Sequence, residues 1–254
     1  MTESVVHISS RDNPLLKELR RLATDNAAYR KTGRIWVEGD HLCSAALVRG
    51  LRPAVAVFSE DFWPLAPVEY AQAAIKSVAI PAPLFAEISG LESPAKVGFV
   101  LDLPTDTALQ PLAASVILDR VQDAGNVGSI LRSAGAFGFR QVIALKGTAA
   151  LWSPKVLRAG MGAHFGLHLV EGLSEPELDT LQVPIVVTSS HQGELVQNLR
   201  LPKPCAWAMG HEGQGVCEAL MQRASHFARI GQPGGEESLN VAAAAAICLH
   251  ASSL

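Results

Sequence analysis

The chain has 254 residues, of which 48% are hydrophobic and 18% are charged, and its formal net charge is −3. This composition is typical of a folded globular protein and excludes a disordered chain, and the length allows one or two domains. The net charge gives no global sign of a nucleic-acid partner, and no apolar stretch reaches the length of a membrane span without charges or prolines.

The first hundred residues predict an alternating α/β pattern. Apolar side chains repeat at helical spacing over residues 14–30, with Pro14 near the start and with Lys17, Arg20 and Arg21 on the other face. The predicted strands then cover residues 34–38, 54–58, 77–80 and 96–101, and the predicted helices cover residues 39–50, 70–76 and 83–89.

Basic side chains gather at the N-terminal end. Residues 1–34 carry seven basic residues against four acidic ones, which gives a local charge of +3 and leaves −6 for the remainder. A solvated helix face is the common explanation of such a run, and a surface for a polyanion is the alternative. The seven candidates for RNA contact are Arg11, Lys17, Arg20, Arg21, Arg30, Lys31 and Arg34.

A polar stretch without periodicity, residues 102–112, divides the chain, and within it residues 106–112 form the predicted linker. The predicted domains are therefore 1–105 and 113–254. Strands are expected over 115–119, 141–145, 166–170, 184–188, 205–209 and 227–230, and helices over 126–137, 153–160, 175–181, 193–199, 216–223 and 238–251. Continuous apolar strands separated by helices predict a parallel sheet whose ligands bind beyond the carboxyl ends of the strands.

Three loops in this second half each follow a predicted strand and open a predicted helix. The first places Asn126 between two glycines at a helix start, with Arg132 in the second turn, where it can reach back over the loop. The second, residues 209–216, is rich in glycine and holds Glu212, and the third runs from Ile230 to Asn240. A helix N-terminus favours an anionic or polar ligand, although each loop alone is also explained by ordinary capping.

Several other functions find no support in the sequence. The GxGxxG and GxxxxGK[ST] patterns are absent, so a nicotinamide fingerprint and a P-loop are set aside. No carboxylate or thiol completes a metal set around His164 and His168, so we expect no metal. The four cysteines lack paired spacing and the N-terminus lacks a signal-peptide pattern, so we expect reduced thiols in a cytoplasmic protein.

Together, the three loops resemble the SpoU (TrmH-like) branch of the SPOUT RNA methyltransferases over residues 112–254. The resemblance is carried by the asparagine–glycine–arginine block, the Gly-x-Glu-x-x-Gly block at 210–215 and the Ser-Leu-Asn-Val block at 238–241. It implies methyl transfer from S-adenosylmethionine to a ribose 2′-hydroxyl of RNA, by a homodimer whose α/β, parallel-sheet SPOUT domain contains a deep trefoil knot. Residues 1–105 look like the smaller α/β, ribosomal-protein-like RNA-binding domain that often precedes it.

The resemblance also implies which residues act. The matching functional polar positions, the implied catalytic set, are Arg132, Asn126, Glu212, Ser238 and Asn240, with Ser238 expected as a helix N-cap. The residues expected to hold the donor are Thr188, Ser189, Gly210, Ile230 and Leu239. Because a guanidinium is hard to deprotonate, we expect Arg132 to grip a phosphate and stabilise alkoxide charge, while water, the phosphate or Glu212 takes the proton.

The sequence leaves alternatives open. Ribosomal RNA is the favoured substrate, and the rivals are a transfer-RNA methyltransferase and a catalytically inactive SPOUT-fold protein that binds RNA. These residues do not identify the nucleotide that is methylated. They also do not distinguish a housekeeping role from a role in antibiotic resistance. One departure bears on the donor: the family usually has Ile-Pro-Met after the strand, and this chain has Ile230, Gly231 and Gln232.

Overall fold

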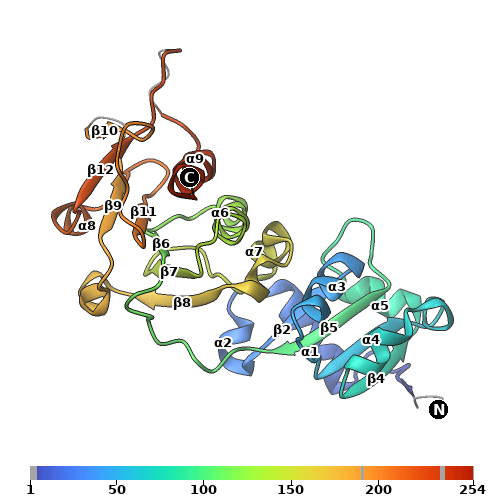
Figure 1. The fold of residues 1–254 in the computed structure, drawn as a ribbon. Coiled ribbons are helices and arrows are strands. Elements are labelled where there is room, and N and C mark those ends of the chain that lie inside the picture. The colour runs from blue at the N-terminus through green and yellow to red at the C-terminus, as the bar shows by residue number, and fades with distance from the viewer. Residues whose placement is uncertain (1–4, 190–191, 235–237, 254) are drawn as a thin grey trace. The chain divides into compact units, whose positions relative to one another are not determined.

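The computed structural model describes residues 5–189, 192–234 and 238–253 and divides into two compact units (Figure 1). Unit 1 comprises residues 1–105 and 152–165, and unit 2 comprises residues 106–151 and 166–254. The segment 152–165, which we predicted within the C-terminal domain, therefore belongs with the N-terminal residues. Its helix α7 (Pro154–Gly160), followed by the short 3-10 helix η2 (Ala163–Gly166), packs on elements of unit 1.

Unit 1 is a mixed sheet with helices around it. Its strands are β1 (Val6–His7), β2 (Arg34–Glu38), β3 (Val55–Ser59), β4 (Lys76–Ile80) and β5 (Val97–Asp102). Within the described residues they pair in the order β1-β4-β3-β5-β2, with β5 antiparallel to both neighbours. The helices are α1 (Pro14–Thr24), α2 (Ala28–Thr32), α3 (Asp40–Val48), η1 (Trp63–Leu65), α4 (Val68–Ala73) and α5 (Ala82–Ile88).

The predicted helix over residues 14–30 is wrong in its length, because it is two helices. Asn13 caps α1 through a hydrogen bond from Leu15 N to Asn13 Oδ1 of 2.9 Å. The helix ends at Thr24, and Asp25 Oδ1 then accepts from Ala27 N at 2.8 Å. Such a side-chain bond to a nearby backbone amide competes with the helical ladder and interrupts the helix.

Unit 2 contains the parallel sheet that the apolar runs predicted. Its strands are β6 (Ser115–Leu118), β7 (Gln141–Leu145), β8 (His168–Leu173), β9 (Ile185–Thr188), β10 (Glu194–Leu195), β11 (Ala206–Met209) and β12 (His226–Arg229). They form, among the described residues, one sheet in the order β10-β12-β9-β11-β6-β7-β8 with every pairing parallel. The expected α/β class with a parallel sheet is confirmed. The remaining elements are α6 (Ala124–Ala136), η3 (Glu175–Thr180), α8 (Glu218–Gln222) and α9 (Val241–Ser253).

One predicted helix of unit 2 is wrong, and a second has a different helix type. Residues 193–199 hold strand β10 and a turn, because Val196 N bonds to Arg229 O at 2.8 Å and the segment joins the sheet beside β12. Tertiary pairing has overridden the local pattern there. The helix predicted over 175–181 is the 3-10 helix η3, Glu175–Thr180, with Ser174 and Glu177 in a capping box.

The C-terminal helix also begins later than expected. Helix α9 starts at Val241, and the cap is Asn240, whose Oδ1 accepts from Ala242 N at 2.9 Å and from Ala243 N at 3.3 Å. The prediction that Ser238 is the N-cap is therefore wrong. Residues 235–237 of this loop, which include its two carboxylates, lie outside the described part of the chain.

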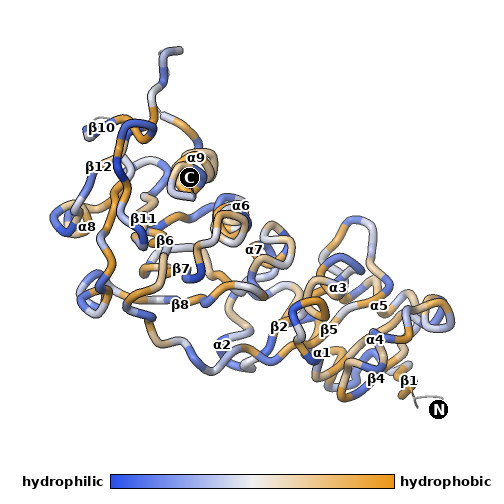
Figure 2. The backbone as a smooth tube through the Cα atoms, viewed as in Figure 1, coloured by the Kyte–Doolittle hydropathy of each residue, from blue (hydrophilic) through white to orange (hydrophobic). Residues whose placement is uncertain are grey.

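Helix α9 is apolar along most of its length, as Figure 2 shows. It packs beside α6 and onto β11, and its alanines allow this close approach. At its far end the indole Nε1 of Trp207 donates to Ser252 Oγ at 2.7 Å, with both side chains buried. None of the helices in the described ranges is long and apolar enough to cross a membrane.

We expect Ser252→Ala to lower the free energy of unfolding by about 1–3 kcal/mol, because it leaves the buried N–H of Trp207 without an acceptor. Urea unfolding would measure this. The exposed neighbour Ser253 supplies the control, since Ser253→Ala should change stability by no more than about 0.5 kcal/mol. Equal losses in the two variants would contradict a specific role for this hydrogen bond.

Candidate functional site

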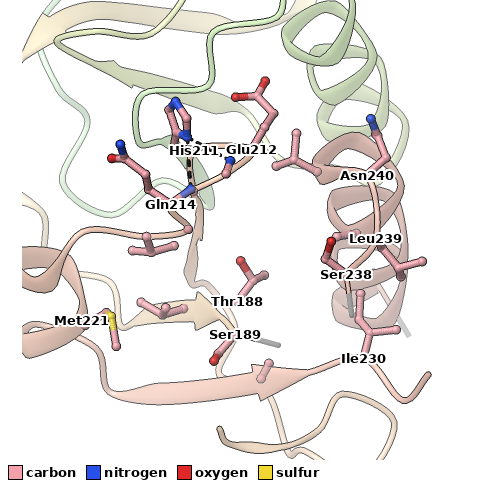
Figure 3. A pocket seen from close by; sticks show the side chains of 18 of the residues that line it. Thr188, Ser189, His211, Glu212, Gln214, Met221, Ile230, Ser238, Leu239 and Asn240 are labelled. Carbon is pink, nitrogen blue, oxygen red and sulfur yellow. Dashed lines mark hydrogen bonds between the residues drawn. The ribbon is translucent and has the colours of Figure 1, made fainter. Parts of the chain in front are cut away.

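A cavity of about 630 Å³ lies beyond the carboxyl ends of three neighbouring strands of unit 2. Residues from three segments contribute to its lining, namely 187–189 at the end of β9, 210–216 after β11, and 228–232 with 238–244 around and after β12 (Figure 3). All five residues expected to hold the donor line it, namely Thr188, Ser189, Gly210, Ile230 and Leu239. Three of the residues expected to be catalytic line it as well, namely Glu212, Ser238 and Asn240.

The loop after β11 folds back on itself and tolerates only glycine at its start. A Cβ atom on Gly210 would lie 2.2 Å from both Gly215 C and Val216 N. His211 and Gly215 exchange two backbone hydrogen bonds, of 3.1 and 2.9 Å. His211 Nδ1 accepts from the backbone amides of Gly213 and Gln214 at 3.0 and 3.2 Å (Figure 3). The loop is therefore a preformed wall of the cavity.

The carboxylate of Glu212 joins this loop to the start of α6. Its oxygens accept from Gln122 N at 3.2 Å, from Asp123 N at 3.1 Å and from Asn126 Nδ2 at 3.1 Å. Burial raises the pKa of Glu212, but hydrogen bonds from its own backbone, from the Asn126 amide and from these two amides together outweigh that effect. The net result is a pKa below the ordinary glutamate value, so the group is held as a carboxylate.

Asn126 and Asn240 continue this network to α9. Asn240 Nδ2 donates to Asn126 Oδ1 at 2.9 Å, while Asn240 Oδ1 caps α9. The line of contacts therefore runs from Glu212 through Asn126 to the N-terminus of the last helix. Three of the residues that the sequence singled out separately are in direct contact.

Arg132 and Ser238 do not join the network in the same way. Ser238 lines the cavity and is exposed. Arg132 is exposed on α6 and, within the described residues, does not line the cavity. This cavity therefore gathers the expected donor positions, whereas the expected catalytic arginine is exposed outside its described lining.

Two functional candidates were missed, Asp119 and Arg120, which directly follow β6. Asp119 is fully buried, and its carboxylate accepts from Arg120 Nε at 2.8 Å and from Cys217 N at 2.6 Å. Arg120 Nη1 donates to Gln214 Oε1 at 2.9 Å. The available signal was a carboxylate and an arginine placed immediately after a buried strand, at the edge where the sheet binds ligands.

The basic residues of unit 1 are mostly paired with carboxylates. The pairs are Arg11 with Glu87 (2.8 Å), Lys17 with Asp12 (3.1 Å), Arg20 with Glu87 (3.5 Å), Arg21 with Asp25 (3.7 Å) and Arg34 with Asp102 (2.9 Å). Arg30 donates to Tyr29 Oη at 3.2 Å, and Lys31 is exposed near the end of α2. Surface pairs of this kind contribute only about 0–1 kcal/mol, so they can be exchanged for contacts with phosphates.

The residues that the structure describes form neither a metal-binding group nor a disulfide. Among the residues that the structure describes, no group of three or more His, Cys, Asp or Glu side chains is placed to hold a metal ion. The four cysteines are free thiols. Burial raises the pKa of Cys205 to about 11 and that of Cys248 to about 12, so both thiols stay protonated and unreactive.

The sequence of this chain is similar to those of named RNA methyltransferases. A family model described as the SpoU rRNA Methylase family matches residues 113–250. The chain is 29% identical over 247 residues to the 23S rRNA (guanosine(2553)-2′-O)-methyltransferase RlmP of Bacillus subtilis, which is 96% of this chain and 97% of that protein. It is 38% identical over 143 residues to the 23S rRNA (guanosine-2′-O-)-methyltransferase RlmB of Coxiella burnetii, covering 54% of this chain and 57% of that one.

A solved structure resembles the whole chain. The AdoMet-bound rRNA methyltransferase from Sinorhizobium meliloti aligns with a TM-score of 0.85 and 25% identity, over 98% of this chain and 97% of that one. The similarity therefore extends over both units and is not confined to residues 113–250.

We expect Glu212→Gln to destabilise the protein at pH 7, because one of its three donors would face an amide NH₂ instead of a carboxylate oxygen. A carboxylate with a lowered folded-state pKa stabilises the fold above its unfolded pKa, about 4.3, and loses that contribution as the pH falls through the folded value. The difference between the two proteins should therefore shrink below about pH 4. Thermal unfolding between pH 7 and pH 3 would measure it, and a constant difference would contradict the role of the charge.

Proposed function

Because the chain belongs to the SpoU rRNA methylase family, we propose that it transfers the methyl group of S-adenosylmethionine to a ribose 2′-hydroxyl of ribosomal RNA. The observation that carries this proposal is that the five positions expected to hold the donor line one cavity. RlmP and RlmB, its relatives, are named as 23S rRNA 2′-O-methyltransferases, and the similar Sinorhizobium structure holds AdoMet.

The cavity suits the donor in size and chemistry. Its volume of about 630 Å³ falls within the range of roughly 300–1,000 Å³ that small-molecule sites occupy. The close approach of Gly210 to the backbone of Gly215 and Val216 fixes the shape of this wall, and Thr188 Oγ1 is fixed by donating to Ala208 O at 3.0 Å. We assign Thr188, Ser189, Gly210, Ile230 and Leu239 to donor binding. Gly231 and Gln232 replace the usual residues beside Ile230 without removing that position from the lining.

When bound, S-adenosylmethionine supplies an electrophilic methyl carbon that needs no activation by the protein. The residues of this chain therefore act mainly by placing the hydroxyl in line with that carbon. Arg132 binds the phosphate next to the reacting ribose and stabilises charge that develops on the 2′-oxygen. The oxygens of Glu212 already accept three hydrogen bonds and its pKa is lowered, so it is a weak base. We assign Glu212 to positioning, together with Asn126 and Asn240. Water or the phosphate then accepts the proton of the 2′-hydroxyl. Ser238, which lines the cavity, faces the donor.

We propose a homodimer that completes the active site. Supporting it, Arg132 is exposed on α6 and lies outside the cavity lining of its own chain as far as the chain is described. The neighbouring α9 is apolar, and its Ile247 side chain is 41% exposed. A second copy would cover this apolar surface and bring an Arg132 to the cavity.

We also propose the deep trefoil knot of the SPOUT fold. In the sheet, β12 lies between β9 and β10, two strands that precede it in the chain. The last strand is thus inserted between earlier segments, as threading of the C-terminal part through a loop requires. Such knots are rare exceptions among protein folds.

Residues 1–105 are proposed as the domain that binds the RNA substrate, through the basic residues of unit 1. The cytoplasm, where ribosomal RNA and the donor meet, is the proposed location. The alternatives are methylation of transfer RNA and RNA binding without catalysis. The names of the relatives favour ribosomal RNA, and the intact set of Asn126, Glu212 and Asn240 favours an active enzyme.

The test is to incubate the protein with labelled S-adenosylmethionine and, separately, with bulk ribosomal and transfer RNA. Label in alkali-resistant dinucleotides from ribosomal RNA supports the proposal, and label from transfer RNA alone supports the first alternative. Label on a base would overturn the ribose chemistry. Donor binding without transfer to either pool supports the inactive alternative.

We expect Arg132→Ala to lower kcat by about a hundredfold or more, because it removes a charge-stabilising group. Arg132→Lys should stay within about tenfold of the unaltered protein if a point charge suffices. Both variants should unfold at the same temperature as the parent, since Arg132 is exposed. Near-total loss of activity in Arg132→Lys, with RNA and donor still bound, would instead assign the role to the planar guanidinium.

For RNA binding, we expect Lys31→Ala to weaken affinity for ribosomal RNA and to reduce the slope of log K against log salt by about one, since one phosphate contact is lost. Lys76, another exposed lysine of unit 1, provides the matched control. Filter binding at several salt concentrations would compare the two. Identical slopes for Lys31→Ala and Lys76→Ala would count against RNA contact at Lys31.

A further inference from the structure

Arg120 has a backbone conformation that arginine rarely adopts. Its φ is +59°, in the left-handed region where a side chain meets its own backbone and glycine is preferred. The surroundings hold it there: Arg120 N donates to Thr148 Oγ1 at 3.1 Å, and a Cβ atom on Gly147 would lie 3.1 Å from the Cγ of Arg120. A glycine would fit this backbone without strain. The arginine must therefore contribute through its side chain.

The guanidinium lies between a buried carboxylate and the loop that lines the cavity. Nε and Nη2 donate to Asp119 at 2.8 and 3.3 Å, and Nη1 donates to Gln214 Oε1 at 2.9 Å. The second oxygen of Asp119 also accepts from Cys217 N at 2.6 Å. Asp119 and Arg120 thus hold the loop at two points, Gln214 and Cys217, from the end of the neighbouring strand.

The held loop forms the wall of the donor cavity. Gln214 lines the cavity, and its backbone amide is tied to His211 inside the same turn. Fixing its side chain therefore fixes the whole of the 210–216 wall. A preformed wall binds a ligand more tightly than one that must be ordered on binding.

We propose that Arg120 is a positioning residue for S-adenosylmethionine, which holds the 210–217 loop in its donor-binding shape through Gln214. The proposal rests on the donor pocket proposed above. Arg120 does not itself line the described cavity, so its effect on the donor is transmitted by the loop.

The decisive variant is Arg120→Lys. Lysine keeps a positive charge beside the buried Asp119 and is subject to the same left-handed strain, but its single ammonium cannot reproduce the fork that joins Asp119 to Gln214. We expect the Kd for S-adenosylmethionine, measured by calorimetry without RNA, to rise about tenfold, a typical effect of breaking one coupled contact. The donor KM should rise similarly, while kcat at saturating donor stays within about twofold, and the unfolding temperature should change little.

Gln214→Ala tests the same link from its other end and leaves the ion pair with Asp119 intact. It should weaken donor binding to a similar extent. The donor affinity of the double variant should be no lower than that of the weaker-binding single variant, as expected of residues that act as one unit. The control is Arg223→Lys. Arg223, like Arg120, is an arginine of unit 2 that joins a carboxylate to a second acceptor, here Asp179 and the backbone oxygen of Glu175. It is not among the residues that line the cavity. Arg223→Lys should leave donor affinity unchanged.

The outcomes separate the inference from the function on which it rests. Unchanged donor affinity in Arg120→Lys and Gln214→Ala overturns the inference, as does full additivity in the double variant. A fall in kcat at saturating donor with unchanged donor affinity also overturns it and assigns Arg120 to the RNA. If Arg120→Lys does not fold, Gln214→Ala alone decides. Absence of donor binding by the unaltered protein overturns the proposed function, and the inference with it, before any variant is compared.

Discussion

The site depends on one constraint, the pairing of the loop after β6 with the loop after β11. Because β6 and β11 are parallel neighbours, their carboxyl ends meet at the same edge of the sheet and the two loops lie side by side. They are joined by hydrogen bonds from Gln122 and Asp123 to Glu212, from Arg120 to Gln214 and from Cys217 to Asp119. Each of these bonds has a charged partner, a carboxylate acceptor or the guanidinium donor, and is therefore stronger than a bond between neutral groups.

Two asparagines are placed relative to this pair of loops. Glu212 satisfies amides at the entry to α6, and Asn126 and Asn240 transfer the alignment to α9. Residues from two loops and two helices are therefore fixed before any ligand arrives. Preorganisation of this kind matters for methyl transfer, because the rate depends on holding one oxygen in line with one carbon.

The parts predicted well from the sequence are those that local pattern determines. The strands over 34–38 and 141–145 match β2 and β7, since the apolar residues of both strands are buried. Strand β7 lies inside a parallel sheet, where a continuous apolar run is expected. The five residues expected to hold the donor also line one cavity, because a parallel sheet brings its carboxyl-terminal loops together.

The parts predicted badly depend on partners that are distant in sequence. Residues 193–199 have helical spacing, but pairing with β12 makes part of them a strand. Two side chains, Ser238 and Asn240, were both suitable as the cap of α9, and only the three-dimensional path of the backbone distinguishes them. The bond of Asp119 to Cys217 spans 98 residues, and no local pattern announces a carboxylate used in that way.

In the proposed reaction, donor binding and charge stabilisation by Arg132 lie on different surfaces. The described lining of the proposed donor cavity belongs to unit 2 of a single chain, and its polar side chains fix the loops. Glu212 is stabilised as a carboxylate, which suits an organising group and not a proton acceptor. The strong cation expected for the reaction is outside that lining, on an exposed face of α6 beside the apolar α9. Donor binding is then a property of one chain, whereas in the proposed homodimer the methyl-transfer step requires two, so that assembly and catalysis are coupled.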